Sequence, residues 1–254
     1  MKKNLLLLFS LFFSNLAYSA DSPKLFIMLD VDNTITDRLE NNDLIVKAKK
    51  SGHEIQQIVF EVKQIDQGFT YYNKNNPNKL ENGLLLVREN LAIRPTLKNF
   101  LEEIIKNSKS HNIETHFLIC SRKPDIRTYA LINNLNYSVD GIVFKDLVDI
   151  VPRNNFREKI KLDGALTSTK SAKILREKYA GKFGPIKPKD FVILIDQLED
   201  KRFIISDQQR DLNIIIPLFE LANNNDLFNI AEDQKKLMSA AKKIKEFIQP
   251  SNIN

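Results

Sequence analysis

Continuous apolar runs of strand length recur along this chain and alternate with segments of helical periodicity. The strand-like runs cover residues 25–29, 115–120, 141–144, 191–195 and 212–216. Runs of this kind are typical of strands buried on both faces of a parallel sheet. Their alternation with helices favours parallel strands joined by right-handed crossovers. The pattern therefore predicts an α/β fold, with a Rossmann-like parallel sheet flanked by helices.

The helices are predicted from apolar positions spaced three or four residues apart. One begins near Pro95, since proline is tolerated in the first turn of a helix, and another follows Pro124. The last helix covers residues 231–247. No clear pattern extends over residues 145–166, which we leave unassigned.

A further helix is expected to begin at Ser168 and Thr169, which are good capping residues. This start would place Lys170 in the first turn, where the helix dipole disfavours a cation. A charge that opposes the local rule is a hint of function.

A different pattern separates the first strand from the helix near residue 95. It contains a helical stretch over residues 43–50 and an alternating strand over 54–63. Two more strands are expected over residues 69–73 and 83–88, on either side of a turn-rich segment. Residues from about 38 to 92 thus predict a small β-containing insertion, placed where it could cover the end of the first strand.

The first strand ends in a cluster of polar residues, among them Asp30, Asp32 and Thr34. In open α/β sheets, ligands bind beyond the carboxyl ends of the strands. A calcium-binding EF-hand loop is excluded, because Ile35 stands where glycine is needed and Asn41 where glutamate is needed. Taken alone, the segment fits an acidic turn as well as it fits a site.

Polar residues at the ends of later strands favour the site. Ser121 follows the second long run, and Asp196 follows the fourth, with Asp200 four residues further on. Lys170 precedes that fourth run. Because parallel strands all end at the same edge of the sheet, we expect these side chains to converge on Asp30.

Over most of residues 24–217, this chain resembles the haloacid-dehalogenase (HAD) superfamily. The four motifs of that superfamily are matched, in order, by LDVDNT, FLICS, Lys170 and LIDQLED. The insertion followed by IRPTLKNFL is similar to the CTD-type phosphatases, which also contain Asp-x-Asp-x-Thr. The resemblance implies one HAD-like phosphatase domain over residues 21–254. The fourth motif departs from the family pattern, since it lacks an adjacent pair of acids.

The resemblance implies roles for the acids. Asp30 would be the nucleophile that forms an aspartyl-phosphate, and Asp32 the general acid and base. Mg²⁺ would be held by Asp30, the main-chain carbonyl of Asp32, and Asp196. Asp200 would lie behind these ligands rather than bind the metal itself.

The resemblance also implies that Thr34, Ser121 and Lys170 bind the phosphoryl oxygens. Lys145, in the segment FKDL, is the alternative to Lys170 as the lysine of the third motif. Lys170 is preferred because it lies closer to Asp196 in the sequence and because of its expected place at the start of a helix.

The amino-terminal residues predict export. Lys2 and Lys3 come before a short apolar run that ends in the small-residue segment Ala-Tyr-Ser-Ala at residues 17–20. This order is typical of a cleaved signal peptide over residues 1–20, and the run is too short and too polar for a membrane anchor. The mature protein is expected to be periplasmic or secreted, without a membrane segment.

Charge and cysteine content exclude some other classes. The net charge of +6 is scattered among acids, so no nucleic-acid partner is expected. The single cysteine, Cys120, permits no internal disulfide.

These features together predict an exported, Mg²⁺-dependent phosphomonoester hydrolase that acts on a small phosphorylated substrate or a phosphoprotein. Two alternatives stay open: a catalytically silent relative that binds a partner, and a phosphotransferase that uses an acceptor other than water.

Overall fold

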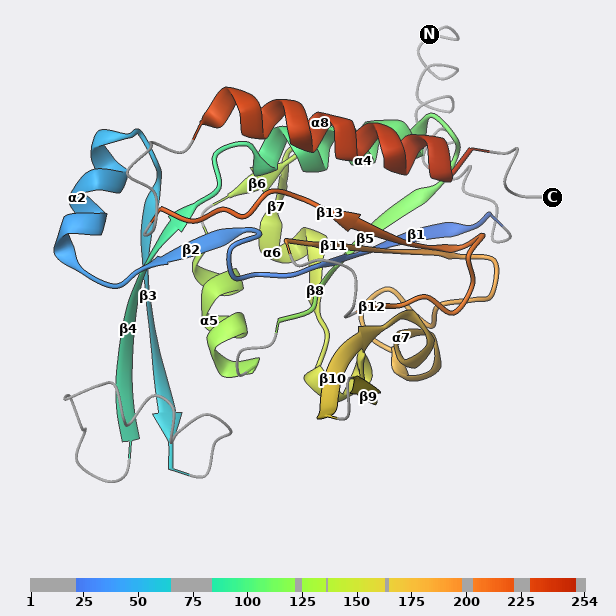
Figure 1. The fold of residues 1–254 in the computed structure, drawn as a ribbon, viewed down its shortest axis with the longest axis horizontal. Coiled ribbons are helices and arrows are strands. Elements are labelled where there is room, and N and C mark those ends of the chain that lie inside the picture. Colours follow the sequence, from blue (N-terminus) through green and yellow to red (C-terminus); the bar gives the residue numbers. More distant parts are fainter. Residues whose placement is uncertain are drawn as a thin grey trace, which may run out of the picture.

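A five-stranded parallel sheet, in the order β13-β11-β1-β5-β8, forms the centre of the molecule (Figure 1). The computed structural model describes residues 22–64, 84–121, 125–135, 137–162, 165–197, 203–221 and 229–249. The strands of the sheet are β1 (Lys24–Leu29), β5 (Glu114–Ile119), β8 (Val148–Ile150), β11 (Phe191–Asp196) and β13 (Asp211–Ile215). Neighbouring strands are paired in parallel. The predicted α/β fold, with a Rossmann-like parallel sheet flanked by helices, is therefore confirmed.

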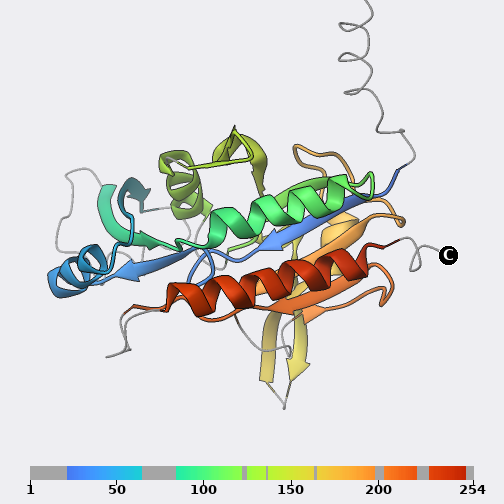
Figure 2. The same cartoon turned by 90° about the horizontal axis from the view of Figure 1, so that it is seen from above.

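Helices cover both faces of this sheet. Helices α4 (Leu97–Lys109) and α8 (Ile230–Phe247) lie side by side over one face (Figures 1 and 2). On β1, Leu25 and Ile27 belong to the hydrophobic core beneath these two helices, whereas Phe26 packs in a second core with α7 (Ala172–Lys178). Successive side chains of a strand point to opposite faces, so the uninterrupted apolar run of β1 is buried on both sides.

The region after β1 forms a separate antiparallel sheet in the order β2-β4-β3 (Figure 1). Its elements are β2 (Thr36–Leu39), β3 (Ile55–Lys63) and β4 (Leu84–Ile93), with helix α2 (Asn42–Lys50) beside them. This sheet packs against helix α5 (Asp125–Asn134) through β3. The strand expected at residues 69–73 lies outside the described residues.

The strand predicted at residues 141–144 is wrong as a member of the central sheet. Among the described residues, strand β7 (Ile142–Val143) pairs with β6 (Ser138–Val139) alone, in a hairpin, and the edge of the central sheet is formed by β8. Asp140 and Gly141 have φ of 51° and 77°, the left-handed values of a tight hairpin turn. Such a turn reverses the chain at once, so this short apolar run cannot continue into the sheet.

The helix predicted to begin at Ser168 and Thr169 is also wrong. Lys170 lies in β10 (Ala165–Ser171), which pairs with β9 (Arg157–Leu162) on one side and β12 (Phe203–Ile204) on the other. The cap of α7 is Ser171, whose hydroxyl oxygen accepts the amide of Ile174 at 3.3 Å. Ser168, Thr169 and Ser171 could each have capped the helix, and the structure uses Ser171. The dipole argument for Lys170 therefore fails.

The segment left unassigned contains short elements: α6 (Phe144–Leu147), β8, the 3-10 helix η1 (Arg153–Asn155) and β9. In the described part of the chain, no helix is both long and apolar enough to cross a bilayer. Residues 1–20 lie outside that part, so the signal peptide stays a prediction.

Candidate active site

The chain turns sharply where β1 ends, and we call residues 30–36 the site loop. The amides of Ile35 and Thr36 both donate to the carbonyl of Val31, at 2.9 and 3.1 Å. Asn33 takes the left-handed conformation, with φ of 59°, which asparagine tolerates better than most residues. The Asp-Val-Asp-Asn-Thr sequence thus folds back on itself and keeps its acids at the carboxyl edge of the central sheet.

Lys170 lies between the acids that end two neighbouring strands. Its Nζ donates to Oδ1 of Asp30 at 2.6 Å and to Oδ2 of Asp196 at 2.9 Å. Asp30 follows β1, Asp196 ends β11, and Lys170 comes from the β9–β10 hairpin. The three residues are buried, with exposed fractions of 7, 4 and 2% for Asp30, Asp196 and Lys170. The structure therefore brings together the three charged residues that the sequence predicted to converge.

Burial and charge act on this group in opposite directions. Burial raises the pKa of Asp30, Lys170 opposes the rise, and the neighbouring Asp196 and Asp32 add to it. Burial alone would lower the pKa of Lys170, but Asp30 and Asp196 outweigh it, so that this pKa is raised. Lys170 is therefore a stable cation, and the single lysine does not fully compensate the acids around it.

Ser121 lies at the same edge of the sheet. It follows β5 directly after Cys120, whose amide donates to the carbonyl of Leu29 at 2.9 Å. This bond ties the end of β5 to the end of β1. Ser121 is 5% exposed and stands beside the strand that carries Asp30.

Thr34 is buried and links the site loop to the segment after β11. Its hydroxyl donates to Oε1 of Gln197 at 2.7 Å. A phosphoryl oxygen needs a donor, and this hydroxyl proton is directed to Gln197 instead. The arrangement favours a role for Thr34 in holding the two loops together, and phosphate binding by Thr34 stays a prediction.

Of the two remaining predicted residues, one lies on the surface and the other lies outside the described residues. Lys145 lies in α6 and is exposed, and of the two lysines considered, Lys170 is the one in contact with Asp30 and Asp196. Asp200 lies outside the described residues.

Sequence reasoning missed a buried arginine next to Asp32. Arg127, on α5, places Nη2 at 3.0 Å from Oδ1 of Asp32 and donates from Nε to Oε2 of Glu89 at 2.6 Å. Glu89 occupies a core position in the alternating pattern of β4, and Arg127 stands four residues before the buried Leu131. A charge at a core position of a periodic pattern was the signal that could have revealed both residues.

A second buried arginine lies behind the site loop. Arg94 donates from Nη1 to the carbonyl of Thr34 at 3.2 Å and from Nε to Oδ2 of Asp233 at 3.0 Å. Asp233 belongs to the first turn of α8. The long carboxyl-terminal helix is thereby connected to the loop that carries Asp30 and Asp32.

The acids at this edge suit a hard divalent cation. Among the described residues, no group of three or more histidine, cysteine, aspartate or glutamate side chains could hold a metal ion. The predicted set needs only two carboxylates, Asp30 and Asp196, and both approach one ammonium group within 2.9 Å. Mg²⁺ commonly binds to one or two carboxylates and keeps several waters, so the residues present fit it.

Comparison with known proteins finds no matching family model and no similar curated protein. Solved structures of similar shape include that of Fcp1, an essential RNA polymerase II CTD phosphatase, with a TM-score of 0.43 and 13% identity over 94% of this chain. Another is fission yeast Fcp1-R271A bound to beryllium fluoride, with a TM-score of 0.37 and 15% identity over 88% of this chain. The chain spans about half the length of these structures, 55 and 52%. Similarity at this level assigns neither a family nor an activity.

Proposed function

We propose that this protein is a Mg²⁺-dependent phosphomonoester hydrolase of the HAD type, which acts through an aspartyl-phosphate on Asp30. The observation that supports it best is the position of Lys170 Nζ, 2.6 Å from Asp30 and 2.9 Å from Asp196. An ion pair that only stabilised the fold would need one acid for this lysine. Two buried acids leave negative charge uncompensated, which is costly unless a ligand uses it.

In the first step, a carboxylate oxygen of Asp30 attacks phosphorus in line with the departing oxygen. The bond between phosphorus and the substrate oxygen breaks, and the proton of Asp32 passes to that oxygen. Lys170 and Ser121 would bind the phosphoryl oxygens. The lysine reduces the repulsion between the attacking carboxylate and the phosphate.

In the second step, Asp32, now a carboxylate, takes a proton from the water that attacks phosphorus. Inorganic phosphate leaves, Asp30 is restored, and Asp32 regains the proton that it gave. The side chain of Asp32 is 30% exposed, whereas that of Asp30 is 10% exposed. Contact with solvent suits the residue that must exchange protons with leaving group and water.

Mg²⁺ would be held by Asp30, Asp196 and the main-chain carbonyl of Asp32. When bound, it supplies positive charge that orients the phosphate and offsets the charge developed during transfer. The raised pKa of Asp30 fits this requirement, because burial favours the protonated acid and a second cation would favour the carboxylate that attacks.

Export belongs to the proposal, on the evidence of residues 1–20 alone. Mass spectrometry of the protein from its native host should show a mature chain that begins near Ala20 or Asp21. An intact Met1 in the exported fraction would contradict it. The substrate is proposed to be a small phosphorylated molecule or a phosphoprotein.

The experiment that tests the activity is a panel of phosphomonoesters, assayed by phosphate release with Mg²⁺ and with a chelator. Release in the presence of Mg²⁺, lost in the chelator and in Asp30→Asn, is the expected result. A folded protein that releases no phosphate from any ester would favour the silent binding relative. Transfer of phosphate to an added alcohol in preference to water would favour a phosphotransferase.

A further inference from the structure

We propose that Arg127 is a positioning residue, which orients Asp32 for proton transfer and is itself fixed by Glu89 of the insertion. The inference rests on the proposed function, since it concerns the acid and base of that reaction. It assigns to the β2-β4-β3 sheet a direct part in preparing the site.

The contacts of Arg127 join three parts of the fold. The guanidinium comes from α5, and its Nε donates to Oε2 of Glu89 on β4 at 2.6 Å. Its Nη2 lies 3.0 Å from Oδ1 of Asp32 in the site loop. The other oxygen of Glu89, Oε1, lies 3.9 Å from Nε of Arg38 on β2. A buried arginine therefore connects the insertion to the proposed acid and base.

The burial of these groups argues against a role in stability alone. The side chains of Arg127 and Glu89 are 1 and 2% exposed, and Glu89 lies on the face of β4 that also buries Leu85, Val87 and Leu91. A buried ion pair is often no more stabilising than apolar residues of similar volume, because both charges lose their hydration. Charges at two facing core positions therefore call for another reason, and the contact with Asp32 supplies one.

The geometry at Asp32 determines which oxygen can transfer the proton. The side chain is 30% exposed, so without a fixed partner it would sample several rotamers in a partly open site. Arg127 Nη2 forms an ion pair with Oδ1 at 3.0 Å, so Oδ2 would be the oxygen that transfers the proton. A general acid must lie within hydrogen-bond reach of its target, so this orientation bears directly on the rate.

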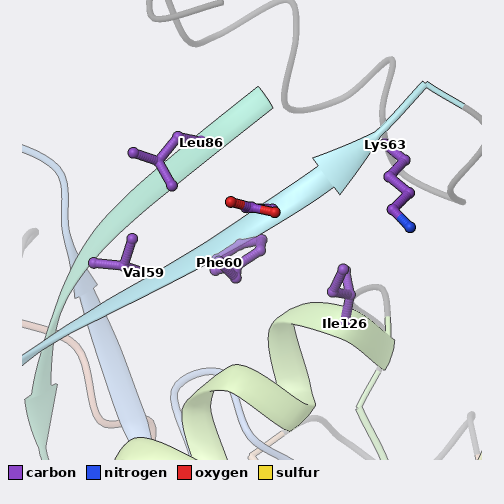
Figure 3. A pocket seen from close by; sticks show the side chains of 6 residues that line it. Val59, Phe60, Lys63, Leu86 and Ile126 are labelled. Carbon is purple, nitrogen blue, oxygen red and sulfur yellow. The ribbon is translucent and has the colours of Figure 1, made fainter. Parts of the chain in front are cut away.

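A groove lies next to the contact between α5 and the insertion. Strands β3 and β4 and helix α5 border this groove, which is lined by Val59, Phe60, Glu61, Lys63, Leu86 and Ile126 (Figure 3). Ile126 immediately precedes Arg127 on α5. The bond from Arg127 to Glu89 links α5 to β4 of the insertion.

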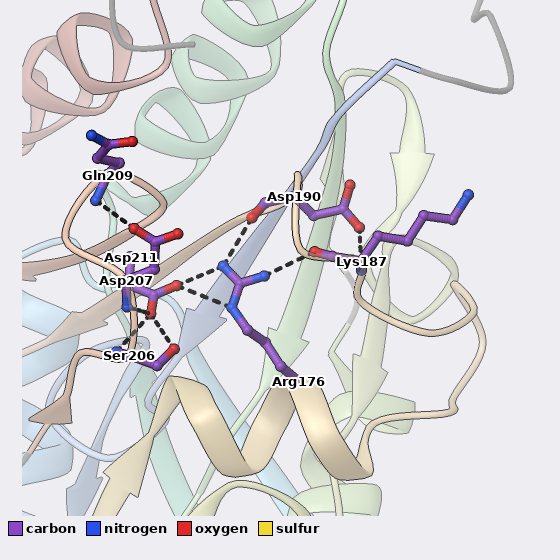
Figure 4. A network of polar contacts seen from close by, with 7 residues as sticks. All are labelled: Arg176, Lys187, Asp190, Ser206, Asp207, Gln209 and Asp211. Carbon is purple, nitrogen blue, oxygen red and sulfur yellow. Dashed lines mark hydrogen bonds and ion pairs between the residues drawn. The ribbon is translucent and has the colours of Figure 1, made fainter. Parts of the chain in front are cut away.

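The test compares Arg127→Met and Arg127→Lys with a matched control, Arg176→Met. Arg176 forms an equally short ion pair, with Nη2 at 2.6 Å from Oδ1 of Asp211 (Figure 4). That pair lies near the amino ends of β11 and β13, at the opposite edge of the sheet from Asp30. Arg176→Met therefore reproduces the loss of a partly buried ion pair without touching the site.

The informative measurement is kcat and KM on an alkyl phosphate and on p-nitrophenyl phosphate. The alkyl leaving group needs a proton, whereas p-nitrophenolate does not. Arg127→Met should lower kcat/KM about 100-fold on the alkyl ester and about 10-fold or less on the aryl ester, because kcat/KM reports formation of the aspartyl-phosphate and excludes its hydrolysis, which needs Asp32 for both esters. Arg127→Lys, which keeps the charge, should recover part of the loss. Glu89→Gln should change the two rates in the same direction as Arg127→Met, with a smaller effect. Arg176→Met should leave the ratio of kcat/KM on the alkyl ester to kcat/KM on the aryl ester as in the wild type.

Equal losses of kcat/KM on both esters in Arg127→Met and Arg127→Lys would overturn the positioning role while leaving the proposed function intact. A rise in KM as the main effect would also overturn it, since Arg127 would then bind substrate. If Arg127→Met does not fold, the ratio of kcat/KM on the two esters in Arg127→Lys tests the positioning role by itself. Inactivity of the wild type on both esters would overturn the proposed function and this inference together.

Discussion

Two buried clusters of charged residues contact the site loop, and they differ in the ratio of cations to carboxylates. In one, Arg94 is fully buried, pairs with Asp233 and donates to the carbonyl of Thr34. In the other, Lys170 lies between Asp30 and Asp196. The first cluster has one cation for one carboxylate, and the second has one cation for two. Burial is nearly the same in both, so burial alone does not distinguish a structural contact from a reactive one.

The difference in balance has opposite consequences for stability and for activity. Arg94 and Asp233 satisfy each other, and removing either would leave an uncompensated buried charge. The cluster around Lys170 has two carboxylates for one ammonium group, and burial, together with Asp196 and Asp32, raises the pKa of Asp30. Removing one acid from it should cost the fold little and the chemistry much.

The largest expected effects are a loss of activity without loss of stability in Asp30→Asn and a loss of stability in Arg94→Met. Asp30→Asn should lower kcat by on the order of 10⁴-fold or more, because covalent attack is removed, and should leave Tm unchanged or raised. Arg94→Met should lower the free energy of unfolding by about 3–5 kcal/mol. Measuring kcat and the thermal unfolding of both variants checks this. Loss of stability in Asp30→Asn with activity retained would contradict the distinction between the clusters.

A smaller but still large effect separates the two candidate lysines. Lys170→Ala should lower kcat by on the order of 10³-fold, since it removes the cation between nucleophile and phosphate. Lys145→Ala should stay within about 2-fold of the wild type, because Lys145 is exposed on α6. Assays of both variants under one set of conditions make the comparison. The opposite order would move the third motif to Lys145.

The smallest expected effect is on stability with Mg²⁺ and pH. A carboxyl whose pKa is raised on folding binds protons that the unfolded chain has lost, so without metal the free energy of unfolding falls as pH rises above the ordinary value of 3.8 for Asp30. Mg²⁺ competes with that proton, and its affinity should therefore rise with pH. At saturating Mg²⁺ and neutral pH, Tm should increase by on the order of 5 °C.

The control for this pH dependence is Asp30→Asn, in which Mg²⁺ should shift Tm little at any pH. It is needed because burial also raises the pKa of Asp37, to about 6, so that residue titrates in the same range. A shift with Mg²⁺ that is independent of pH, or that persists in Asp30→Asn, would place the metal elsewhere.

The central sheet could be predicted from the sequence because its strands are continuous apolar runs. Strands β1, β5, β11 and β13 match the expected runs to within one residue at each end. Strand β8, with three residues, and the β6–β7 hairpin are too short for hydrophobic periodicity to distinguish a strand from a loop. Lys170 was placed in a helix because several hydroxyl residues in succession could each have formed the cap.

The candidate site could be predicted in part for a similar reason. Asp30, Ser121 and Asp196 follow buried strands, and the topology of a parallel sheet brings strand ends to one edge. Arg127 and Glu89 could not be paired in this way, because their contact depends on how α5 packs against the insertion. Each breaks a periodic pattern locally, but neither pattern identifies the other residue as its partner.

The central claim is that the unbalanced cluster holds the nucleophile, and the most direct measurement is rapid-quench labelling of Asp32→Asn. With an aryl phosphate, whose leaving group needs little protonation, this variant should form the aspartyl-phosphate and then fail to hydrolyse it. Peptide mapping should find the phosphate on Asp30, with Mg²⁺ present and not with a chelator. Phosphate on another residue, or none trapped while the wild type turns over the same substrate, would contradict the account.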